Sequence, residues 1–245
     1  MRDINIHDGA LVSLVIPCYN EEGNVEKLLA KTSLLMRMEP RFEVIFVNNG
    51  STDSTGALLE ELTQNLPGTR VVNLDRNSGY GNGIKKGLEL STGRIVGWTH
   101  ADLQTNPLDA LRGLQAAGDT LENIFIKGLR KKRPLVDTAF THGMSILESL
   151  LFRTNLRDIN AQPTLFSRDL LNTVLEGPND FSLDLYSMVI ASDAGYKQIR
   201  FPVDFGPRFH GSSKWNTSTL ARLRFIKRTL RFSLALAKKR WTACS

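Results

Sequence analysis

Residues 94–104 read RIVGWTHADLQ, and this stretch decides how the rest of the chain is interpreted. The apolar run 94–98 predicts a buried strand, and Asp102 follows just past its carboxyl end. Open α/β sheets bind ligands beyond the carboxyl ends of their strands. Asp102 and Gln104 offer oxygen ligands for Mg²⁺ or Mn²⁺, and such an ion can bridge a diphosphate. The alternative is that Asp102 only caps the next helix, which we expect to begin near Pro107.

Strands and helices alternate through the first half of the chain. Apolar runs predict strands at 11–16, 42–47, 70–74 and 94–98. Between them, apolar spacing or a capping residue predicts helices at 24–38, from Ser51 or Asp53 to Leu62, and at 83–90. Four such units predict an α/β fold with a doubly wound, mostly parallel sheet and helices on both faces. The less regular second half suggests strands at 123–126 and 197–203, and helices at 139–152 and 181–191.

The polar segments that follow these four strands are expected to meet at one edge of the sheet, as a nucleotide site requires. They are residues 19–22, 48–51, 77–83 and 100–104. The segment Gly79-Tyr80-Gly81-Asn82-Gly83 follows the third strand and lacks the spacing of a dinucleotide fingerprint. Gly81 and its neighbours either present backbone amides to a phosphate or allow close packing of loop and helix.

Two basic segments are candidates for binding phosphate. Residues 208–214 combine Arg208 and Lys214 with a glycine and two serines, a composition suited to closing over a diphosphate. Residues 126–133 end in a basic cluster that includes Arg130, which would bind an acceptor phosphate or anionic headgroups. The alternative for either segment is a solvated basic loop.

The net charge of +6 is concentrated near the end of the sequence. Residues 219–241 contain eight basic residues and no acidic one, so the rest of the chain is nearly neutral. On a helical wheel an apolar stripe lies beside a basic face, and the stripe consists of Leu223, Ile226, Leu230, Leu234, Ala237 and Trp241. This pattern predicts either a helix in the interface of an anionic membrane or a helix packed on the rest of the domain.

Composition restricts the cellular setting. The two cysteines, Cys18 and Cys244, form neither a disulfide framework nor a zinc signature. Residues 1–10 do not resemble a secretory signal, and no apolar run reaches the ~18 residues of a membrane span. We therefore expect a cytoplasmic protein, with peripheral attachment to the inner face of the membrane as an option.

Five motifs in order resemble glycosyltransferase family 2, whose members have the GT-A fold and use nucleotide-activated sugars. They are Val15 to Glu22 (VIPCYNEE), Val47 to Asp53 (VNNGSTD), Asn77 to Gly83 (NSGYGNG), His100 to Gln104 (HADLQ) and Arg208 to Lys214 (RFHGSSK). Within the family, the set is most similar to the dolichol-phosphate mannose synthase and polyprenyl-phosphate glycosyltransferase branch. The resemblance covers residues 11–214.

The resemblance implies roles for the matching positions. Pro17, Tyr19 and Glu21 would line the base and ribose pocket, with Asn49 and Ser51 near the base. Asp102 and Gln104 would hold the metal on the diphosphate. Arg208 and Lys214 would clamp its phosphates.

The chain departs from the family pattern at two carboxylates. Asn48-Asn49 replaces the usual Asp-Asp, which puts the preference for the nucleobase in question because an amide both donates and accepts. His100 replaces the first Asp of Asp-Ala-Asp, which either weakens Mg²⁺ binding or favours Mn²⁺, with His100 as a further metal ligand.

The sequence therefore predicts a metal-dependent, inverting glycosyltransferase that uses a nucleoside diphosphate sugar. Its acceptor would be a polyprenyl phosphate or a cell-surface glycan precursor. A hydroxyl acceptor needs a general base, for which Asp158 and Asp184 are the candidates, whereas a lipid phosphate needs none. The expected division is a GT-A domain at 1–215 and a basic amphipathic helix at 216–245. The alternatives are a nucleotide-sugar-binding protein with weak or no turnover and, disfavoured because no recognition module is visible, a nucleic-acid-binding protein.

Overall fold

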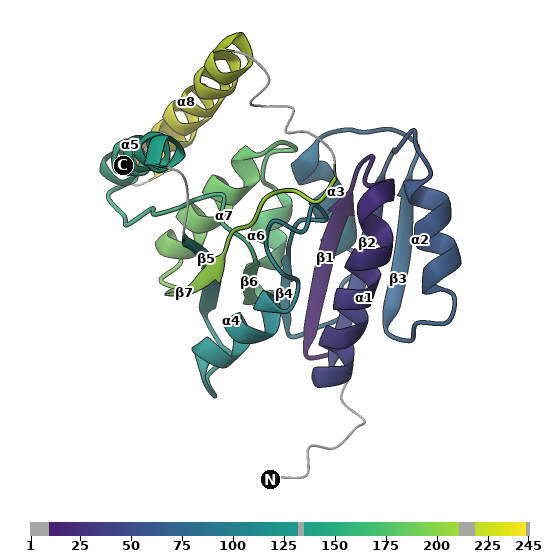
Figure 1. Cartoon of the computed structure of the whole chain (residues 1–245). Helices are drawn as coiled ribbons and strands as arrows, with labels where there is room; N and C mark the ends of the chain where they lie inside the picture. Colours follow the sequence, from purple (N-terminus) through teal and green to yellow (C-terminus); the bar gives the residue numbers. More distant parts are fainter. Residues whose placement is uncertain (1–9, 132–134, 211–218, 244–245) are drawn as a thin grey trace.

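The computed structural model describes residues 10–131, 135–210 and 219–243. They form one seven-stranded sheet in the order β3-β2-β1-β4-β6-β5-β7, with helices on either side (Figure 1). The strands are β1 (Val12–Cys18), β2 (Phe42–Asn49), β3 (Thr69–Leu74), β4 (Ile95–Trp98), β5 (Ile124–Lys131), β6 (Thr164–Ser167) and β7 (Lys197–Asp204). β6 pairs antiparallel with both β4 and β5, and the other pairings are parallel.

Alternating side chains of the strands divide the core into two layers, because successive residues of a strand point to opposite faces. In β1, Leu14 and Ile16 join the layer beneath α1 (Glu22–Met38), α2 (Thr55–Thr63) and α4 (Asp109–Ala117). Val15 joins the opposite layer, beneath α3 (Tyr80–Leu88), α6 (Leu171–Leu175) and α7 (Ser182–Asp193). The predicted α/β class, with a mostly parallel sheet and helices on both faces, is confirmed.

The prediction omitted β6, which follows the cis peptide bond between Gln162 and Pro163. β6 has four residues, all of them buried, and such a short run carries no periodic signal. It lies between β4 and β5, so Trp98, Thr164 and Lys127 are neighbours in adjoining strands. This insertion brings Lys127 close to the end of β4.

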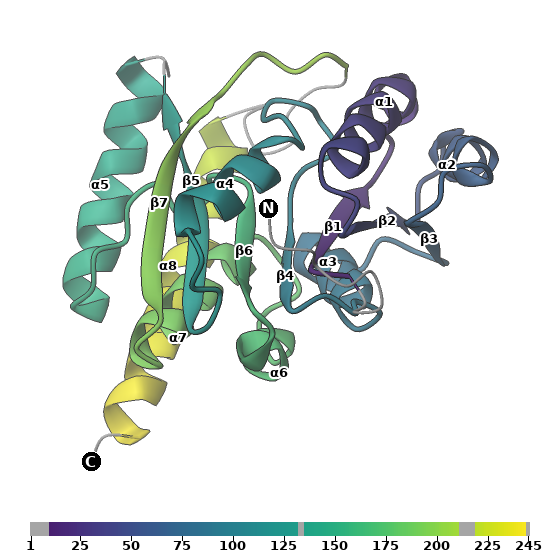
Figure 2. The same cartoon turned by 90° about the horizontal axis from the view of Figure 1, so that it is seen from below.

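Two further helices complete the fold: α5 (Leu135–Phe152) lies beyond the β7 edge of the sheet, and α8 (Thr219–Ala243) runs across the face of the sheet that α7 covers (Figure 2). Ser233 of α8 donates a hydrogen bond to Glu148 of α5 (2.7 Å), and Ala237 is buried in the core. The stripe predicted from the wheel is therefore divided: Ala237 faces the domain, whereas Leu234 and Trp241 are exposed. None of the described helices is long and apolar enough to cross a membrane.

Candidate functional site

The loops that follow β1 and β2 are joined by hydrogen bonds at the carboxyl edge of the sheet. The backbone N–H of Asn20 donates to Ser51 Oγ (3.1 Å), and that of Glu21 donates to Thr55 Oγ1 (2.8 Å). Asn48 Oδ1 in turn accepts from the Ser51 backbone (3.1 Å). These bonds hold the half-buried residues Pro17, Tyr19, Glu21 and Ser51, all expected to bind the nucleotide, in one rim.

The glycine segment before α3 packs tightly against the chain that leads into α7. A Cβ at Gly81 would lie 2.4 Å from the Pro178 carbonyl oxygen, and one at Gly79 would lie 2.2 Å from that of Asn179. Gly79 also has a φ of 111°, which L-residues rarely adopt. This geometry matches the packing alternative for Gly81. Asn49, almost fully buried, donates to the Gly79 carbonyl (3.0 Å), so it also supports this segment.

Asp102 follows β4, as predicted, and it is paired with Arg208. The distance between Arg208 NH2 and Asp102 Oδ2 is 3.0 Å. Gln104 joins the same two loops, because its side chain donates to the Gly206 carbonyl (3.1 Å) and accepts from Arg208 Nε (3.2 Å). The structure therefore brings together Asp102, Gln104 and Arg208 from segments about 100 residues apart, as the resemblance implied.

The segment after β7 forms a strap, residues 205–210, that runs toward the carboxyl end of β1 (Figure 1). Beyond Arg208, the Phe209 ring lies 4.0 Å from Lys27 Nζ of α1. A Cβ at Gly23, also in α1, would meet the His210 ring at 2.6 Å. The strap thus connects the Asp102 loop to the start of α1. Lys214, predicted to act with Arg208, lies outside the described residues.

Glu21 belongs to the same electrostatic group as Asp102 and Arg208. Burial raises the pKa of Glu21, and the charge of Asp102 raises it further. The hydrogen bond from Asn24 and the charge of Arg208 lower the pKa of this carboxyl group. A cation that enters between Glu21 and Asp102 would therefore be stabilised by both side chains.

A chain of hydrogen bonds that is half-buried at one end and fully buried at the other lies next to Asp102. It runs from His100 Nε2 to the Tyr80 hydroxyl (2.9 Å) and from that hydroxyl to Gln162 Nε2 (3.3 Å). Gln162 Nε2 also donates to Asp184 Oδ1 (3.0 Å), which forms an ion pair with Lys127 Nζ (2.8 Å). Lys127 and Asp184 are 0% and 1% exposed. Asp184, a predicted base, thus lies in an ion pair deep in the domain.

Sequence reasoning missed Lys127, Gln162 and Tyr80 as members of this chain. Burial lowers the pKa of Lys127, while the charge of Asp184 raises it. A lysine that interrupts the apolar run Ile124-Phe125-Ile126 was the signal that could have revealed it, because a lysine inside a strand core must find a partner.

Arg130 and Asp158 are also paired. Arg130 Nε lies 2.9 Å from Asp158 Oδ1, and the Arg130 backbone donates to Asp158 Oδ2 (2.8 Å). Arg200 of β7 donates to the Gly128 carbonyl (2.8 Å) and lies close enough to interact with Asp158, Arg130 and Arg157. Burial lowers the pKa of Arg200 to about 10, and the charges of Arg130 and Arg157 also lower it. Arg130 and Arg200 thus both contact Asp158, the first through its carboxylate and the second through its backbone carbonyl (3.4 Å), and Arg157 lies within electrostatic range of Arg200.

The side chains suit a divalent ion that arrives with a diphosphate. Among the described residues, no group of three or more His, Cys, Asp or Glu side chains could hold a metal ion by itself. Asp102 is buried and holds a cationic group, the Arg208 guanidinium, on Oδ2. Mg²⁺ at nucleotide sites is typically bound by one or two carboxylates together with substrate phosphates and water. His100, expected as a further ligand, has its Nε2 engaged by Tyr80.

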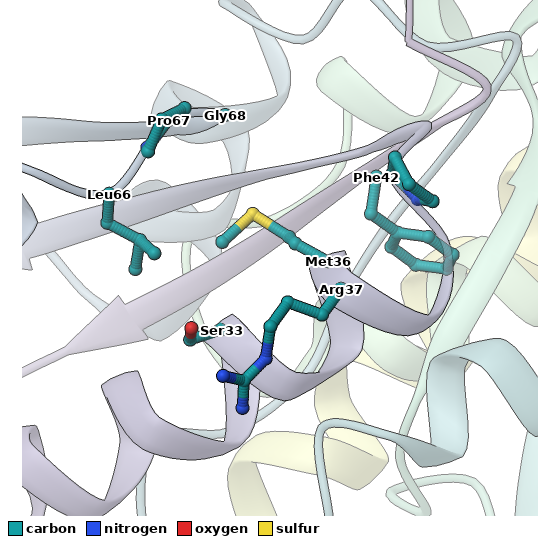
Figure 3. A pocket seen from close by; sticks show the side chains of 8 residues that line it. Ser33, Met36, Arg37, Phe42, Leu66, Pro67 and Gly68 are labelled. Atoms are coloured by element: carbon teal, nitrogen blue, oxygen red, sulfur yellow. The ribbon is translucent and has the colours of Figure 1, made fainter.

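A hollow of about 310 Å³ lies elsewhere, between the end of α1 and the loop before β3 (Figure 3). Its lining includes Met36, Arg37, Phe42, Pro67 and Gly68. Phe42 begins β2 and Gly68 precedes β3, so the hollow lies at the amino edge of the sheet. It is therefore separate from the polar loops, and none of the predicted site residues lines it.

Comparison with known families gives one match that covers most of the chain. The family model described as Glycosyl transferase family 2 matches residues 13–174. This range begins within β1, includes β4 and Asp102, and ends within α6.

Curated relatives have similar descriptions. The undecaprenyl-phosphate 4-deoxy-4-formamido-L-arabinose transferase of Edwardsiella ictaluri is 28% identical over 221 residues, which cover 87% of this chain and 66% of that protein. An uncharacterized glycosyltransferase of Synechocystis sp. is 28% identical over 213 residues, with coverages of 84% and 64%. The chain therefore spans slightly less than two thirds of these relatives.

Solved structures share the fold. A mannosyltransferase from Pyrobaculum calidifontis in complex with GDP-Man and Mn²⁺ superposes with a TM-score of 0.61 and 22% identity, over 84% of this chain and 59% of that one. Glucosyl-3-phosphoglycerate synthase from Mycobacterium tuberculosis, in complex with Mn²⁺, UDP-Glc and phosphoglyceric acid, gives 0.71 and 19%, with coverages of 94% and 80%. Both are GT-A glycosyltransferases, which confirms the predicted fold type.

Proposed function

The chain belongs to glycosyl transferase family 2, and from this premise we propose that it transfers a sugar from a nucleoside diphosphate sugar to a phosphate-bearing acceptor. The observation that carries the proposal is the position of two charged groups at the carboxyl edge of the sheet. Asp102 and Arg208 form the first group, and Arg130 and Arg200, which contact Asp158, form the second. The first suits a donor diphosphate, and the second suits an anionic acceptor.

On the donor side, the rim of Pro17, Tyr19, Glu21, Asn49 and Ser51 would bind the nucleoside. Asp102, with Gln104 beside it, would hold Mg²⁺ or Mn²⁺, which supplies positive charge to the leaving diphosphate when it is bound. Arg208 would exchange its contact with Asp102 for one with a phosphate oxygen, because a guanidinium binds either anion. Lys214 would add a second positive charge to this clamp.

The reaction would proceed by direct displacement at the anomeric carbon, with inversion. The acceptor oxygen forms a bond to that carbon while the bond to the diphosphate oxygen breaks, and the diphosphate leaves with the electron pair. Negative charge grows on the leaving group, and Arg208, which lies beside Asp102, would stabilise it.

The ion pairs favour a phosphate over a hydroxyl as the acceptor. Asp158 is engaged by Arg130, and Asp184 is 1% exposed and engaged by Lys127. A carboxylate held in this way is poorly placed as a general base, because its oxygens are already engaged by the partner cation and not by an acceptor hydroxyl. An acceptor phosphate is already anionic and needs no base. Relatives named as undecaprenyl-phosphate transferases support the same choice.

We expect Arg200→Met to raise the KM for a phosphate acceptor by about 10- to 100-fold, the range of one charge-assisted hydrogen bond. Hydrolysis of the donor in the absence of acceptor should stay unchanged. The measurement uses short-chain polyprenyl phosphates and a panel of UDP and GDP sugars with Mn²⁺. Arg168→Met is the matched control, because Arg168 also donates to backbone, at the Gly93 carbonyl, but near the amino end of β4. Equal losses of donor hydrolysis and transfer in Arg200→Met would contradict the acceptor assignment.

The same donor panel separates the proposal from its alternative, a nucleotide-sugar-binding protein with weak or no turnover. Replacement of carboxylates by Asn48 and His100 is the observation that favours this alternative. Donor binding without metal-stimulated hydrolysis or transfer would support it and reject the transferase.

We also propose that α8 holds the domain on an anionic membrane surface, where a polyprenyl phosphate would reside. Lys227, Arg231, Leu234 and Trp241 are exposed on α8, which has no acidic residue. The exposed α5 side chains Ile146, Leu147 and Leu150 add apolar surface nearby. Basic residues near an anionic membrane contribute about 1 kcal/mol each.

Lys227→Glu/Arg231→Glu is therefore expected to reduce sedimentation with anionic liposomes at least ~10-fold at low salt. The two substitutions leave the buried face of α8 intact, which deletion of the helix would not, since Ala237 lies in the core. Arg37→Glu/Lys197→Glu makes the same change of charge at exposed positions in α1 and β7. Equal sedimentation of the two double variants would exclude α8 as the attachment surface.

A further inference from the structure

The interface between α5 and α8 buries a carboxyl group that contacts no cation among the described residues. Glu148 of α5 is 0% exposed, and its hydrogen-bond partner is the Ser233 hydroxyl of α8, 2.7 Å from Oε1. That hydroxyl also lies 2.9 Å from the Thr229 carbonyl oxygen, so its one proton serves two acceptors if Glu148 is ionised. The second oxygen, Glu148 Oε2, is buried and has no partner in the described part of the chain. An ionised carboxylate in this setting has lost its water without adequate compensation.

The positive charges of α8 do not compensate Glu148. Arg240, the half-buried one, pairs with Asp193 of α7. The other basic side chains described on α8 are exposed, and none of them forms an ion pair with Glu148: Lys227, Arg228, Arg231, Lys238 and Lys239. The other titratable residues of α5, Asp137 and His142, lie six or more residues from Glu148 along the helix. No described side chain therefore offsets a negative charge at this position.

The two faces of α5 show that Glu148 belongs to the helix contact. Ser145 and Glu148 are buried, whereas Ile146, Leu147 and Leu150 are exposed. The described part of α5 thus turns polar side chains inward and apolar ones outward, the opposite of a helix whose outer face is solvated. Because the partner of Glu148 lies on α8, this carboxyl group gains access to water when α8 moves away from α5.

We propose that the contact between α5 and α8 is proton-linked: Glu148 is a neutral carboxylic acid while α8 is docked on α5, and it ionises when the two helices separate. Protonation removes the buried charge. The acid still forms a hydrogen bond with Ser233, because a hydroxyl both donates and accepts, so the proposal does not depend on which group donates. The proton linkage is independent of the proposed transfer reaction, and only its bearing on membrane attachment rests on the proposed function.

The sign of the pH dependence follows from the burial. Burial raises the pKa of Glu148, and the hydrogen bond with Ser233 lowers it by a smaller amount. The docked state therefore binds the proton more tightly than the separated state, in which a solvated glutamate has a pKa of about 4.3. Docking of α8 should then weaken as the pH rises from that value through the raised pKa of the docked state, and stay constant above it. An anionic membrane surface attracts protons as it attracts other cations, so it would favour the docked state.

Carbon NMR of the full chain, labelled at the side-chain carboxyl groups of glutamate, tests the protonation directly. Glu148→Gln assigns the Glu148 signal by its disappearance, and we expect this signal to titrate above those of exposed glutamates. Glu43 provides the contrast. Burial raises the pKa of Glu43, but hydrogen bonds from Ser13 and Thr92 and the charge of Arg70 lower it by more, so its signal should titrate below them. A Glu148 signal that titrates together with the exposed glutamates would overturn the proposal.

Amide hydrogen exchange of residues 227–240 tests whether the proton is linked to docking, with rates corrected for the intrinsic effect of pH and with α1 as the internal reference for global stability. We expect the protection of α8 to fall by roughly tenfold between about pH 5 and pH 8 in the unsubstituted protein.

Glu148→Gln, which is neutral at every pH and keeps the hydrogen bond, should hold α8 at its low-pH protection throughout. Glu26→Gln makes the same change at an exposed position of α1 and should leave the pH dependence intact. An unchanged pH dependence in Glu148→Gln, or a loss of protection at every pH, would reject the proton linkage. Neither measurement uses a sugar donor, so a failure of the proposed function would show separately, as an absence of transfer.

Discussion

Asp102→Asn is expected to reduce the rate of sugar transfer by ~10²-fold or more while the fold is retained, because it removes the buried carboxylate assigned to the metal. The amide keeps the shape of the side chain and can still accept from the Gln104 backbone, as Asp102 Oδ1 does at 3.2 Å. It cannot balance the charge of a divalent ion or of Arg208. Affinity for Mn²⁺ in the presence of UDP or GDP, measured by titration calorimetry, should therefore fall together with the rate.

Asp109→Asn is the matched control for this experiment. Asp109 is as buried as Asp102 and also pairs with an arginine, Arg112 (2.6 Å), but it lies in the first turn of α4. Both variants lose an ion pair made by a buried carboxylate, so both should lose some stability, and we expect only Asp102→Asn to lose activity. Full metal-dependent transfer by folded Asp102→Asn would remove Asp102 from the site.

The position of Asp102 could be predicted because parallel strands end at a common edge. The apolar runs at 11–16 and 42–47 indicated buried strands, and their alternation with helices implied a parallel sheet. The residue just past each strand was then placed without knowledge of any contact. This reasoning located the Asp102 loop near the Glu21 loop, which the mutual effect of their charges now supports.

The partners of the charged residues could not be predicted in the same way. Asp158 and Asp184 were candidate bases because their carboxylates are visible in the sequence, whereas Arg130 and Lys127 as their partners are not. Those pairs join residues 28 and 57 positions apart, and they depend on where β6 inserts. A four-residue antiparallel strand leaves too weak a pattern to fix that insertion.

The α8 helix shows a different limit of prediction from the sequence. The helical wheel placed Ala237 and Leu234 in one stripe, because a wheel records which residues are apolar and not what each of them packs against. In the structure the buried face instead includes Ser233, whose hydroxyl bonds to Glu148, and Ala237. A small polar residue with a partner in the neighbouring helix is thus buried, and a leucine without one is exposed.

Lys127→Met should lower the free energy of unfolding by about 3–5 kcal/mol, because it leaves Asp184 charged and buried without its partner. Lys127 is fully buried and donates to both Asp184 and Thr164 (2.6 Å), so no solvent can replace the lost ammonium group. For a chain of this size, the midpoint of thermal unfolding should fall by roughly 6–20 °C. Denaturant titration and calorimetry would measure both quantities.

The cause of that loss can be isolated with two further variants. Lys127→Met/Asp184→Asn removes both charges, and Asn can still accept from Gln162, so much of the stability should return. Lys86→Met breaks an ion pair with Glu89 of the same 2.8 Å length, but its side chains are 46% and 44% exposed, and the expected loss is below about 1 kcal/mol. Burial, not the length of the ion pair, would then explain the difference. If the double variant were as unstable as Lys127→Met, the loss would come from packing around Lys127, and the isolated charge of Asp184 would not be its cause.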